Sequence, residues 1–339
     1  MAYIQLNKKN FFHNLDIINK HAKDKSKIAI VLKDNAYGHG LLEISKMAMD
    51  YGIKNAVVKN TKEATIIKDY FDNILILADA NNSTYSHTFH IVINDAQDIE
   101  CLKSNTNIHI KIDTGMHRNG ISINDLESTI YKALERNLNI TGVFTHHKSA
   151  DVLSSEFYWQ NVQFNDIKIE LREICEKLNL SNIKLHSCNS AAFFRTTNPS
   201  DDLYRIGIAA YGYKMDNFLS NNIGLKPVLS LHAKKLSSRV LKKGQRVGYG
   251  GIFTAQENIN ISTYDIGYAD GLKRFSQSFI NIENNNKILG RISMDNCAID
   301  STDEDICIFK DTKEQAILHN TIEYEILTSL NANIKRVIV

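Results

Sequence analysis

A repeating alternation of strand and helix patterns over the first 212 residues constrains the fold more than any other feature of the sequence. Eight short runs rich in β-branched residues predict strands, and segments with apolar residues at helical spacing lie between most of them. The strand runs are KIAIVLK (27–33), NAVVKN (55–60), ILILAD (74–79), HIVIND (90–95), IHIKID (108–113), ITGVFTH (140–146), IKLHSC (183–188) and LYRIGIAAYG (203–212). Strands that are apolar on both faces and alternate with helices form parallel sheets, so the pattern predicts an α/β fold, a (β/α)8 barrel of the TIM type.

The pattern changes after about residue 225. Strand-like runs separated by Gly and Asn turns replace it, and helical patterns nearly vanish. We therefore predict a barrel over residues 1–225 and a mainly β C-terminal domain over residues 226–339, with a boundary near Asn221 to Pro227. The first few residues are candidates to pair with the β domain.

Composition excludes several classes of partner. The chain has 40 Lys and Arg against 38 Asp and Glu, spread along its length, so neither nucleic acid nor a membrane surface is indicated. Five cysteines stand far apart without CxxC spacing, which is typical of reduced thiols. The N-terminus has no secretory h-region, and no apolar run approaches the roughly 18 residues of a membrane span. We expect a cytoplasmic protein.

Polar residues lie at or near the ends of several apolar strands. In a parallel barrel these ends line the mouth, where chemistry takes place. Any one of them alone is more simply a solvated or ion-paired residue, but their common location favours a functional site. The residues are Lys33, Lys111, Asp113, His146, His186 and Arg205.

Lysine at a barrel mouth has a chemistry that other residues do not supply. Its amine, when partly desolvated or close to another cation, loses its proton and condenses with a carbonyl, most commonly that of pyridoxal phosphate. That cofactor also needs a phosphate site, a partner for its pyridine nitrogen and a group near its phenolate oxygen. The sequence offers Ser190 at a helix start, the backbone at Gly207, and the side chains of Arg205 and Arg118.

Nine motifs occur in a fixed order over most of the chain. They are VLKDNAYGHG, KIDTGMHRNG, FTHHKSAD, HSCNSAA, YRIGIAAYG, VGYGGIFTA, IGYADG, GRISMDN and TIEYE. With them the sequence resembles the alanine racemases, which are pyridoxal phosphate enzymes of fold type III with a barrel followed by a β domain. A single motif of this kind is weak evidence for a family, but nine motifs in the same order are specific to it.

The resemblance implies two catalytic residues. Lys33 corresponds to the lysine that holds the cofactor and acts as a base on one face of the substrate α-carbon, and Tyr249 corresponds to the tyrosine that acts on the opposite face. Racemisation requires such a pair. A phenol with a pKa near 10 needs help to act as a base, and the resemblance assigns that help to His146 and Arg205. Without the motif, Tyr249 reads as a core or cross-strand aromatic.

The resemblance also assigns three cationic side chains around the cofactor. Arg205 faces the pyridine nitrogen, where a fixed cation disfavours protonation and limits side reactions such as transamination. Arg118 reaches the phenolate oxygen and the substrate carboxylate, a task suited to a guanidinium. Lys111 corresponds to a lysine that carries a carbamate in many relatives.

A phosphate-binding group follows from the same resemblance. Its members are Tyr37, Ser190, the backbone at Gly207 and Ile208, and Tyr324, with Asn189 and His186 as supports. Two simpler roles stay open, since Tyr37 also suits packing at a helix start and Ser190 suits an N-cap.

The remaining correspondences line the substrate pocket. Met294 and Asp295 match a pair near the substrate carboxylate, and Tyr324 with Tyr249 matches a gate that keeps the pocket small. Tyr268 and Asp270 resemble entrance residues, although a structural role is equally compatible with them. Because Tyr249, Met294 and Asp295 belong to the β domain, the resemblance implies a head-to-tail homodimer in which this domain covers the barrel of the other chain.

Three departures from the family pattern are Asp34, His117 and His147. None of them removes a predicted catalytic group. The adjacent pair His146 and His147 has no carboxylate or cysteine spacing that indicates zinc, so we expect no metal.

The expected function is therefore a pyridoxal phosphate-dependent racemase that interconverts L-alanine and D-alanine and supplies D-alanine for peptidoglycan. A broader racemase acting on serine or lysine, or a decarboxylase of the same fold type, stays open. A non-catalytic pyridoxal phosphate-binding protein resembles the barrel alone, so the β domain argues against it. A sugar-binding or scaffold barrel leaves the lysine, arginine and tyrosine residues unexplained.

Overall fold

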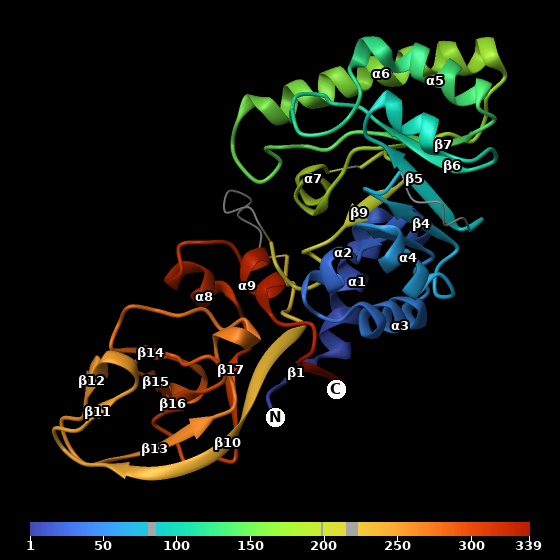
Figure 1. Ribbon diagram of the computed structural model, residues 1–339. Coiled ribbons are helices and arrows are strands. Elements are labelled where there is room, and N and C mark those ends of the chain that lie inside the picture. The colour runs from blue at the N-terminus through green and yellow to red at the C-terminus, as the bar shows by residue number, and fades with distance from the viewer. Residues whose placement is uncertain (81–85, 198, 215–222) are drawn as a thin grey trace. The chain divides into compact units, whose positions relative to one another are not determined.

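The computed structural model describes residues 1–80, 86–197, 199–214 and 223–339, which form two units (Figure 1). The barrel unit comprises Phe12–Asp34 and Ile44–Lys226. The β unit comprises Met1–Phe11, Asn35–Glu43 and Pro227–Val339. Two N-terminal segments thus belong with the C-terminal part of the chain, and Asn221, at the expected boundary, lies outside the described residues. Among those residues, no helix is both long and apolar enough to cross a membrane.

Eight parallel strands make up the sheet of the barrel unit. They pair in the order β8-β7-β6-β5-β4-β3-β2-β9, so the last strand returns to the first. This near-closed barrel confirms the predicted fold class, and each predicted strand run overlaps one observed strand. The strands are β2 (Ile28–Val31), β3 (Asn55–Val58), β4 (Asn73–Ile76), β5 (Phe89–Ile93), β6 (Asn107–Lys111), β7 (Asn139–Phe144), β8 (Lys184–His186) and β9 (Tyr204–Ile206).

Helices lie between these strands and cover the outside of the sheet, as α5 and α6 do over β6 and β7 (Figure 1). α6 begins after Ser154, whose side chain accepts a hydrogen bond from Glu156 N, and it ends at the left-handed residue Asn179. Phe164, Ile167, Leu171 and Ile174 give it a buried stripe at helical spacing. The longer helices are α1 (Lys8–Ala22), α3 (Leu41–Tyr51), α4 (Thr61–Ile67), α5 (Leu126–Glu135), α6 (Ser155–Leu178) and α7 (Ser190–Arg195).

The β unit contains an eight-stranded sheet around the long strand β10. β1 pairs with β10 antiparallel and with β18 parallel, so the first residues of the chain are part of this sheet. The strands of the sheet are β1 (Tyr3–Leu6), β10 (Leu229–Leu241), β13 (Ile259–Tyr264), β14 (Phe279–Asn281), β15 (Lys287–Leu289), β16 (Cys297–Ile299), β17 (Asp305–Phe309) and β18 (Lys335–Ile338).

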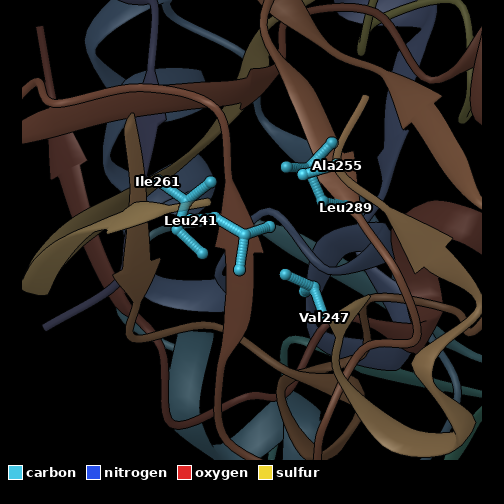
Figure 2. Packing of buried hydrophobic residues seen from close by; sticks show 5 residues of the cluster. All are labelled: Leu241, Val247, Ala255, Ile261 and Leu289. Carbon is cyan, nitrogen blue, oxygen red and sulfur yellow. The ribbon is translucent and has the colours of Figure 1, made fainter. Parts of the chain in front are cut away.

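A short hairpin of β11 (Arg246–Val247) and β12 (Phe253–Thr254) packs beside this sheet. Figure 2 shows the apolar cluster at this place, which consists of Leu241, Val247, Ala255, Ile261 and Leu289. Burial of these side chains anchors the hairpin that carries residues 248–252.

The expectation that helices nearly vanish after residue 225 is wrong for the end of the chain. α8 (Lys313–Leu318) and α9 (Glu323–Ser329) lie before the last strand. Each helix buries only an adjacent pair, Gln315 and Ala316 in α8 and Ile326 and Leu327 in α9, which is too short a pattern to give a helical periodicity.

Candidate active site

Lys33 opens an unusual turn, α2 (Lys33–Tyr37), which follows β2 after Leu32. Asp34, Asn35, Ala36 and Tyr37 have φ values of +54°, +56°, +52° and +52°, so the turn is left-handed. A left-handed helical residue with a Cβ costs about 1–2 kcal/mol, so four in a row persist only where the surroundings impose them. Such strain is typical of functional sites. The glycines and the histidine of VLKDNAYGHG do not predict a left-handed conformation for the residues that precede them.

Hydrogen bonds close the segment that follows this turn. Asn35 receives two, from Leu41 N to its Oδ1 at 2.9 Å and from Gly40 N to its carbonyl oxygen at 3.0 Å. His39 N donates to Ala36 O at 3.1 Å, and His39 Nδ1 lies 3.0 Å from Tyr37 O. The backbone conformation around Tyr37 is therefore fixed by its own neighbours in sequence.

Gly38 explains why residues 35–43 belong to the β unit. A Cβ atom on this residue would lie 2.0 Å from Leu327 O in α9, and its φ is +78°, so only glycine fits. Arg336 Nη2 donates to Gly38 O at 2.9 Å. The rings of Tyr37 and Tyr324 lie 5.5 Å apart, so this packing brings together two residues of the predicted phosphate group.

Arg205, on β9, is the most constrained cation of the barrel unit. It is 4% exposed, with Nη1 2.6 Å from His186 Nδ1 and Nη2 donating to Thr145 O at 2.8 Å and Ser187 O at 3.0 Å. Nη2 also lies 3.4 Å from His146 Nδ1. Among the described residues, the guanidinium thus bonds ring nitrogens and carbonyl oxygens and no carboxylate. Burial lowers its pKa to about 10.

A second histidine continues from Arg205 through His186. His186 Nε2 lies 2.9 Å from His109 Nδ1, and both rings are buried. A guanidinium only donates, so His186 accepts at Nδ1, carries its proton on Nε2 and donates to His109. Burial is the main reason why the pKa of each histidine lies well below 6.5. Both rings are therefore neutral, and the positive charge stays on Arg205.

His109 was missed in the sequence, although a signal for it exists. It lies two residues before Lys111 on β6, so both side chains point to the same face of the sheet. The neighbouring strand β7 has Gly142 opposite it, where a Cβ atom would lie 2.4 Å from His109 Nδ1. The glycine is needed because the imidazole occupies its side-chain space.

Lys111 ends β6 with an amine that is easily neutralised. It is 8% exposed, and burial, followed by the charges of Arg118 and Arg205, lowers its pKa to about 8. Asp113 acts in the opposite direction. Asp113 Oδ1 also accepts hydrogen bonds from the backbone of Gly115 at 2.9 Å, so it orders the loop that carries Arg118.

His146 follows β7 and lies close to the same cations. Burial, followed by the charge of Arg205, lowers its pKa well below 6.5, so its ring is neutral. It is thus suited to accept a hydrogen bond rather than to add a further charge beside Arg205 and Arg118.

Ser190 starts α7, but it is not the cap of that helix. The N-cap is Asn189, whose Oδ1 accepts a hydrogen bond from Ala192 N at 2.9 Å, so the N-cap interpretation of Ser190 is wrong. Ser190 Oγ instead accepts from Gly207 N at 3.0 Å, next to the buried Ile208. The barrel part of the predicted phosphate group is therefore assembled in one place.

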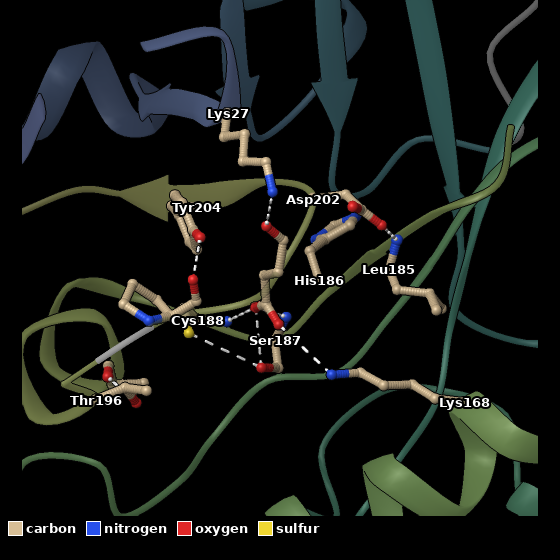
Figure 3. Close-up of polar contacts among 12 residues, drawn as sticks. Lys27, Lys168, Leu185, His186, Ser187, Cys188, Thr196, Asp202 and Tyr204 are labelled. Atoms are coloured by element: carbon tan, nitrogen blue, oxygen red, sulfur yellow. Dashed lines mark hydrogen bonds and ion pairs between the residues drawn. The ribbon is translucent and has the colours of Figure 1, made fainter. Parts of the chain in front are cut away.

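The buried carboxylate of Asp201, also missed in the sequence, holds the segment between His186 and Asn189, in which Figure 3 labels Ser187 and Cys188. Asp201 Oδ2 accepts hydrogen bonds from Cys188 N at 2.8 Å and from Ser187 Oγ at 3.0 Å. Because Ser187 O accepts from Arg205, Asp201 helps to set the position of that guanidinium. The sequence signal is the acidic pair that precedes LYRIG.

The β unit presents Tyr249, Met294 and Asp295 on its surface. Tyr249, in η4 (Tyr249–Gly251), is 65% exposed, and Met294 is 54% exposed. The Tyr249 hydroxyl makes no hydrogen bond within the described part of the chain, so the interpretation as a core aromatic is wrong. Asp295 is also exposed, and Met294 O accepts from Ala269 N at 3.0 Å in the loop that carries Tyr268 and Asp270.

Comparison with known proteins decides the family. Residues 6–215 match the family description "Alanine racemase, N-terminal domain", and residues 228–338 match "Alanine racemase, C-terminal domain". The chain belongs to the alanine racemase family. An alanine racemase of a Nitratiruptor species is 46% identical over 336 residues, and one of Campylobacter concisus is 42% identical over 337 residues. Each alignment covers 99% of both chains.

Solved structures of alanine racemases share the fold. That of Clostridium difficile 630 has a TM-score of 0.87 at 24% identity and covers 100% of this chain and 95% of its own. A histidine racemase from Leuconostoc mesenteroides subsp. sake has a TM-score of 0.86 at 23% identity and covers 100% of this chain and 98% of its own. These likenesses show the fold alone.

The residues of this alanine racemase family member fit pyridoxal phosphate. A buried guanidinium that bonds no carboxylate among the described residues suits an unprotonated pyridine nitrogen, which can only accept a hydrogen bond. Ser190 Oγ accepts from Gly207 N and keeps its own hydroxyl proton to donate, and Tyr37 and Tyr324 carry hydroxyl groups, so these side chains are donors of the kind a phosphate binds. Lys33 follows β2 at the C-terminal end of a barrel strand, where the active sites of such barrels lie, and a lysine amine can condense with a carbonyl group.

Proposed function

We propose that the protein interconverts L-alanine and D-alanine with pyridoxal phosphate as cofactor, and so supplies D-alanine for peptidoglycan. The observation that carries the proposal is Arg205, a buried cation held by His186 and two carbonyl oxygens instead of a carboxylate. Relatives 41–46% identical over nearly the whole chain carry the name alanine racemase. Five free cysteines support a cytoplasmic location, because thiols persist in reducing compartments.

Two residues of this chain take and return the α-proton, Lys33 on one face of the substrate and Tyr249 on the other. Bound pyridoxal phosphate supplies an electron sink that makes this proton removable. Because the two bases belong to different units, each face of the substrate has its own acid–base group. Proton delivery from the face opposite to removal inverts the α-carbon.

Arg205 keeps the pyridine nitrogen unprotonated in this proposal. A proton on that nitrogen would make it a cation beside the Arg205 guanidinium in a buried site, which is costly. The neutral rings of His186 and His109 maintain this arrangement, because His186 accepts from the guanidinium without taking its proton and donates in turn to His109. The expected consequence is a low rate of side reactions such as transamination.

Arg118 binds the substrate carboxylate, and Lys111 orients it as a carbamate. A lysine with a pKa of about 8 has enough neutral amine to react with carbon dioxide, a reaction that releases one proton and leaves an anion. That anion would replace repulsion among Lys111, Arg118 and Arg205 with attraction. A carbamate carbon signal from ¹³C-labelled bicarbonate, absent in Lys111→Arg, tests the modification; no signal near pH 8 would contradict it.

The exposure of Tyr249 and Met294 supports a homodimer in which the β unit of one chain completes the barrel site of the other. A tyrosine that acts as a base works best in a site from which water is excluded, and 65% exposure does not provide this. A head-to-tail pair with two-fold symmetry supplies two such sites.

Mixing of two inactive variants tests this arrangement. Chains with Lys33→Ala and chains with Tyr249→Phe, unfolded and refolded together in equal amounts, should recover about a quarter of wild-type activity, since half of the dimers are hybrids with one intact site. If each chain builds its own site, the mixture stays as inactive as its components.

Incubation with L-alanine in D₂O tests the function itself. The holoenzyme should produce D-alanine that carries deuterium at the α-carbon, and borohydride reduction followed by peptide mapping should label Lys33. Cofactor binding without D-alanine formation would leave a non-catalytic carrier or another substrate.

A broader substrate range is the second candidate. The structural likeness to a histidine racemase shows that this fold accommodates a racemase named for a larger amino acid. The activity should be highest with alanine in a panel of L-amino acids that includes serine, lysine and histidine. Equal or greater activity with another member of the panel would favour the broader function.

A further inference from the structure

Gln160, on α6, has a buried side chain whose amide is fully used. The residue is 1% exposed. Its Nε2 donates to Thr114 Oγ1 at 3.1 Å and to His146 O at 3.1 Å, and its Oε1 accepts from Lys148 N at 2.9 Å. A carbonyl accepts on one side and a backbone N–H donates on the other, so only one orientation of the amide satisfies all three contacts.

A chain of hydroxyl groups extends from this amide into the barrel. Thr145 Oγ1 lies 2.9 Å from Ile112 O and must donate to it, because a carbonyl oxygen only accepts. Thr114 Oγ1, 2.7 Å from Thr145 Oγ1, must therefore donate in turn, which leaves it to accept from Gln160. Each of the three side chains, Gln160, Thr114 and Thr145, must therefore donate a hydrogen bond to one particular acceptor, and all three are buried.

The contacts of Gln160 join two loops that carry proposed site residues. Thr114 starts the loop of residues 114–120, which contains Arg118 and returns to the sheet where Ile121 N donates to Lys111 O at 2.9 Å. On the other side, His146 and the residue after next, Lys148, belong to the segment that follows β7.

We propose that Gln160 is a positioning residue that fixes the loop of Arg118 against His146. The inference rests on the proposed roles of Arg118 and His146 in racemisation. Without the amide, Thr114 and His146 O lose their common donor, and the two loops are no longer tied to each other through α6. Displacement of about 1 Å at such a site costs on the order of 10²-fold in rate.

Gln163, three residues along α6, provides a matched control. It is exposed, and its amide makes no hydrogen bond with any described residue. Gln160→Glu and Gln163→Glu therefore introduce the same carboxyl group into the same helix, but only the first places an acceptor against Thr114 Oγ1 and His146 O. Lys148 N can still donate to the retained oxygen.

The experiment compares the two variants with wild type as holoenzymes. Gln160→Glu should lower kcat/KM for L-alanine about 10–100-fold, mainly through a higher KM. Cofactor affinity should fall much less than kcat/KM, because the proposed phosphate contacts at Ser190 and Gly207 are not displaced with the Arg118 loop. Burial raises the pKa of the new carboxyl, and its protonated form regains a donor, so activity relative to wild type should rise as the pH falls. A purely structural effect would lower cofactor affinity as well and show no such pH profile.

Hydrogen exchange gives a readout that does not depend on catalysis. Amides of residues 114–120 and 146–148 should exchange faster in Gln160→Glu than in Gln163→Glu, with other barrel segments unchanged. The inference is overturned if the two variants show equal hydrogen exchange, or if they have equal kcat/KM while the wild-type enzyme is active. An inactive wild type refutes the proposed function, and the exchange data then still decide whether Gln160 fixes the loops.

Thr114 provides a second pair of variants in case Gln160→Glu does not fold. Thr114→Ser keeps the hydroxyl and should behave as wild type, whereas Thr114→Val removes it and should reproduce the higher KM and the faster exchange of the loop. Identical behaviour of the two substitutions would contradict the proposal.

Discussion

The residues around Arg205 in the barrel unit and the residues Tyr249 and Met294 in the β unit are held in opposite ways. In the barrel unit Arg205 is 4% exposed and His186 is fully buried, and each has hydrogen-bond partners that fix its geometry. In the β unit Tyr249 is 65% exposed and Met294 54% exposed. The difference teaches that the structure of one chain fixes the position of Arg205 and His186, whereas the proposed action of Tyr249 depends on the proposed dimer to cover this surface.

The largest expected effect separates activity from stability. Tyr249→Phe removes a hydroxyl that makes no hydrogen bond with any described residue, so racemisation should fall about 10²–10⁴-fold while the free energy of unfolding changes by less than about 0.5 kcal/mol. The α-hydrogen of one alanine enantiomer should still exchange with D₂O, because Lys33 remains. Urea unfolding and exchange followed by NMR measure both results, and equal loss of exchange for the two enantiomers would argue against a two-base reaction.

Arg205→Lys should instead lower activity and stability together. Lysine keeps the charge, but its single ammonium group cannot bond His186, Thr145 O and Ser187 O at the positions that the planar guanidinium of arginine reaches. We expect a loss of about 1–3 kcal/mol in the free energy of unfolding and at least a tenfold loss in kcat/KM. A second readout is cofactor absorbance during turnover, which should decay faster as transamination increases. A free energy of unfolding equal to that of wild type would contradict the conclusion that these hydrogen bonds fix Arg205 in the barrel.

The same contrast explains what the sequence could predict. Strand runs are apolar because the barrel buries them, and polar residues at their ends stand out against that background, as Lys111 and His146 do. Tyr249 is a different case, since no pattern of burial marks an exposed aromatic, and only its motif VGYGG pointed to it. Its role stays a prediction.

Features that depend on tertiary contacts could not be predicted. The left-handed turn of Asp34 to Tyr37 goes against the general preference of L-residues, and beside it Gly38 approaches Leu327 O, nearly 300 positions away, so closely that a Cβ atom would not fit. His109, Asp201 and Gln160 act through buried hydrogen bonds to segments distant in sequence. A polar residue in one helix or strand does not reveal such partners.

Acid should affect the barrel unit before the β unit. Burial keeps five barrel histidines neutral, lowering the pKa of His90 and His147 to about 4 and that of the others well below 6.5. Below about pH 6.5 the unfolded chain takes up protons that the native barrel cannot, so each histidine costs about 1.4 kcal/mol of stability per pH unit down to its native pKa. The five are His90, His109, His146, His147 and His186.

The measurement is hydrogen exchange by segment at about pH 7 and about pH 5, a range in which histidines titrate more than carboxylates. Protection should fall more in β5 to β8 than in β10 and β13. The β unit contains His39, whose pKa burial lowers to about 4, together with the partly buried His232 and His319. Earlier loss of protection in β10 would show that carboxylates or the unit boundary dominate acid unfolding.

The smallest expected effect concerns Asp34, which follows Lys33 and is one of the three departures from the family pattern. Its carboxylate pairs with Lys59 Nζ at 3.2 Å, but both side chains are largely exposed, so the pair contributes about 0–1 kcal/mol. Alanine tolerates the φ of +54° slightly less well than aspartate, which adds a few tenths of a kcal/mol. Asp34→Ala should therefore leave kcat/KM within about twofold and lower the free energy of unfolding by no more than about 1 kcal/mol, an effect that added salt should reduce. A tenfold change in kcat/KM with unchanged stability would mean instead that the charge of Asp34 acts on Lys33, and that the barrel half of the site is tuned from its exposed rim as well as from its buried interior.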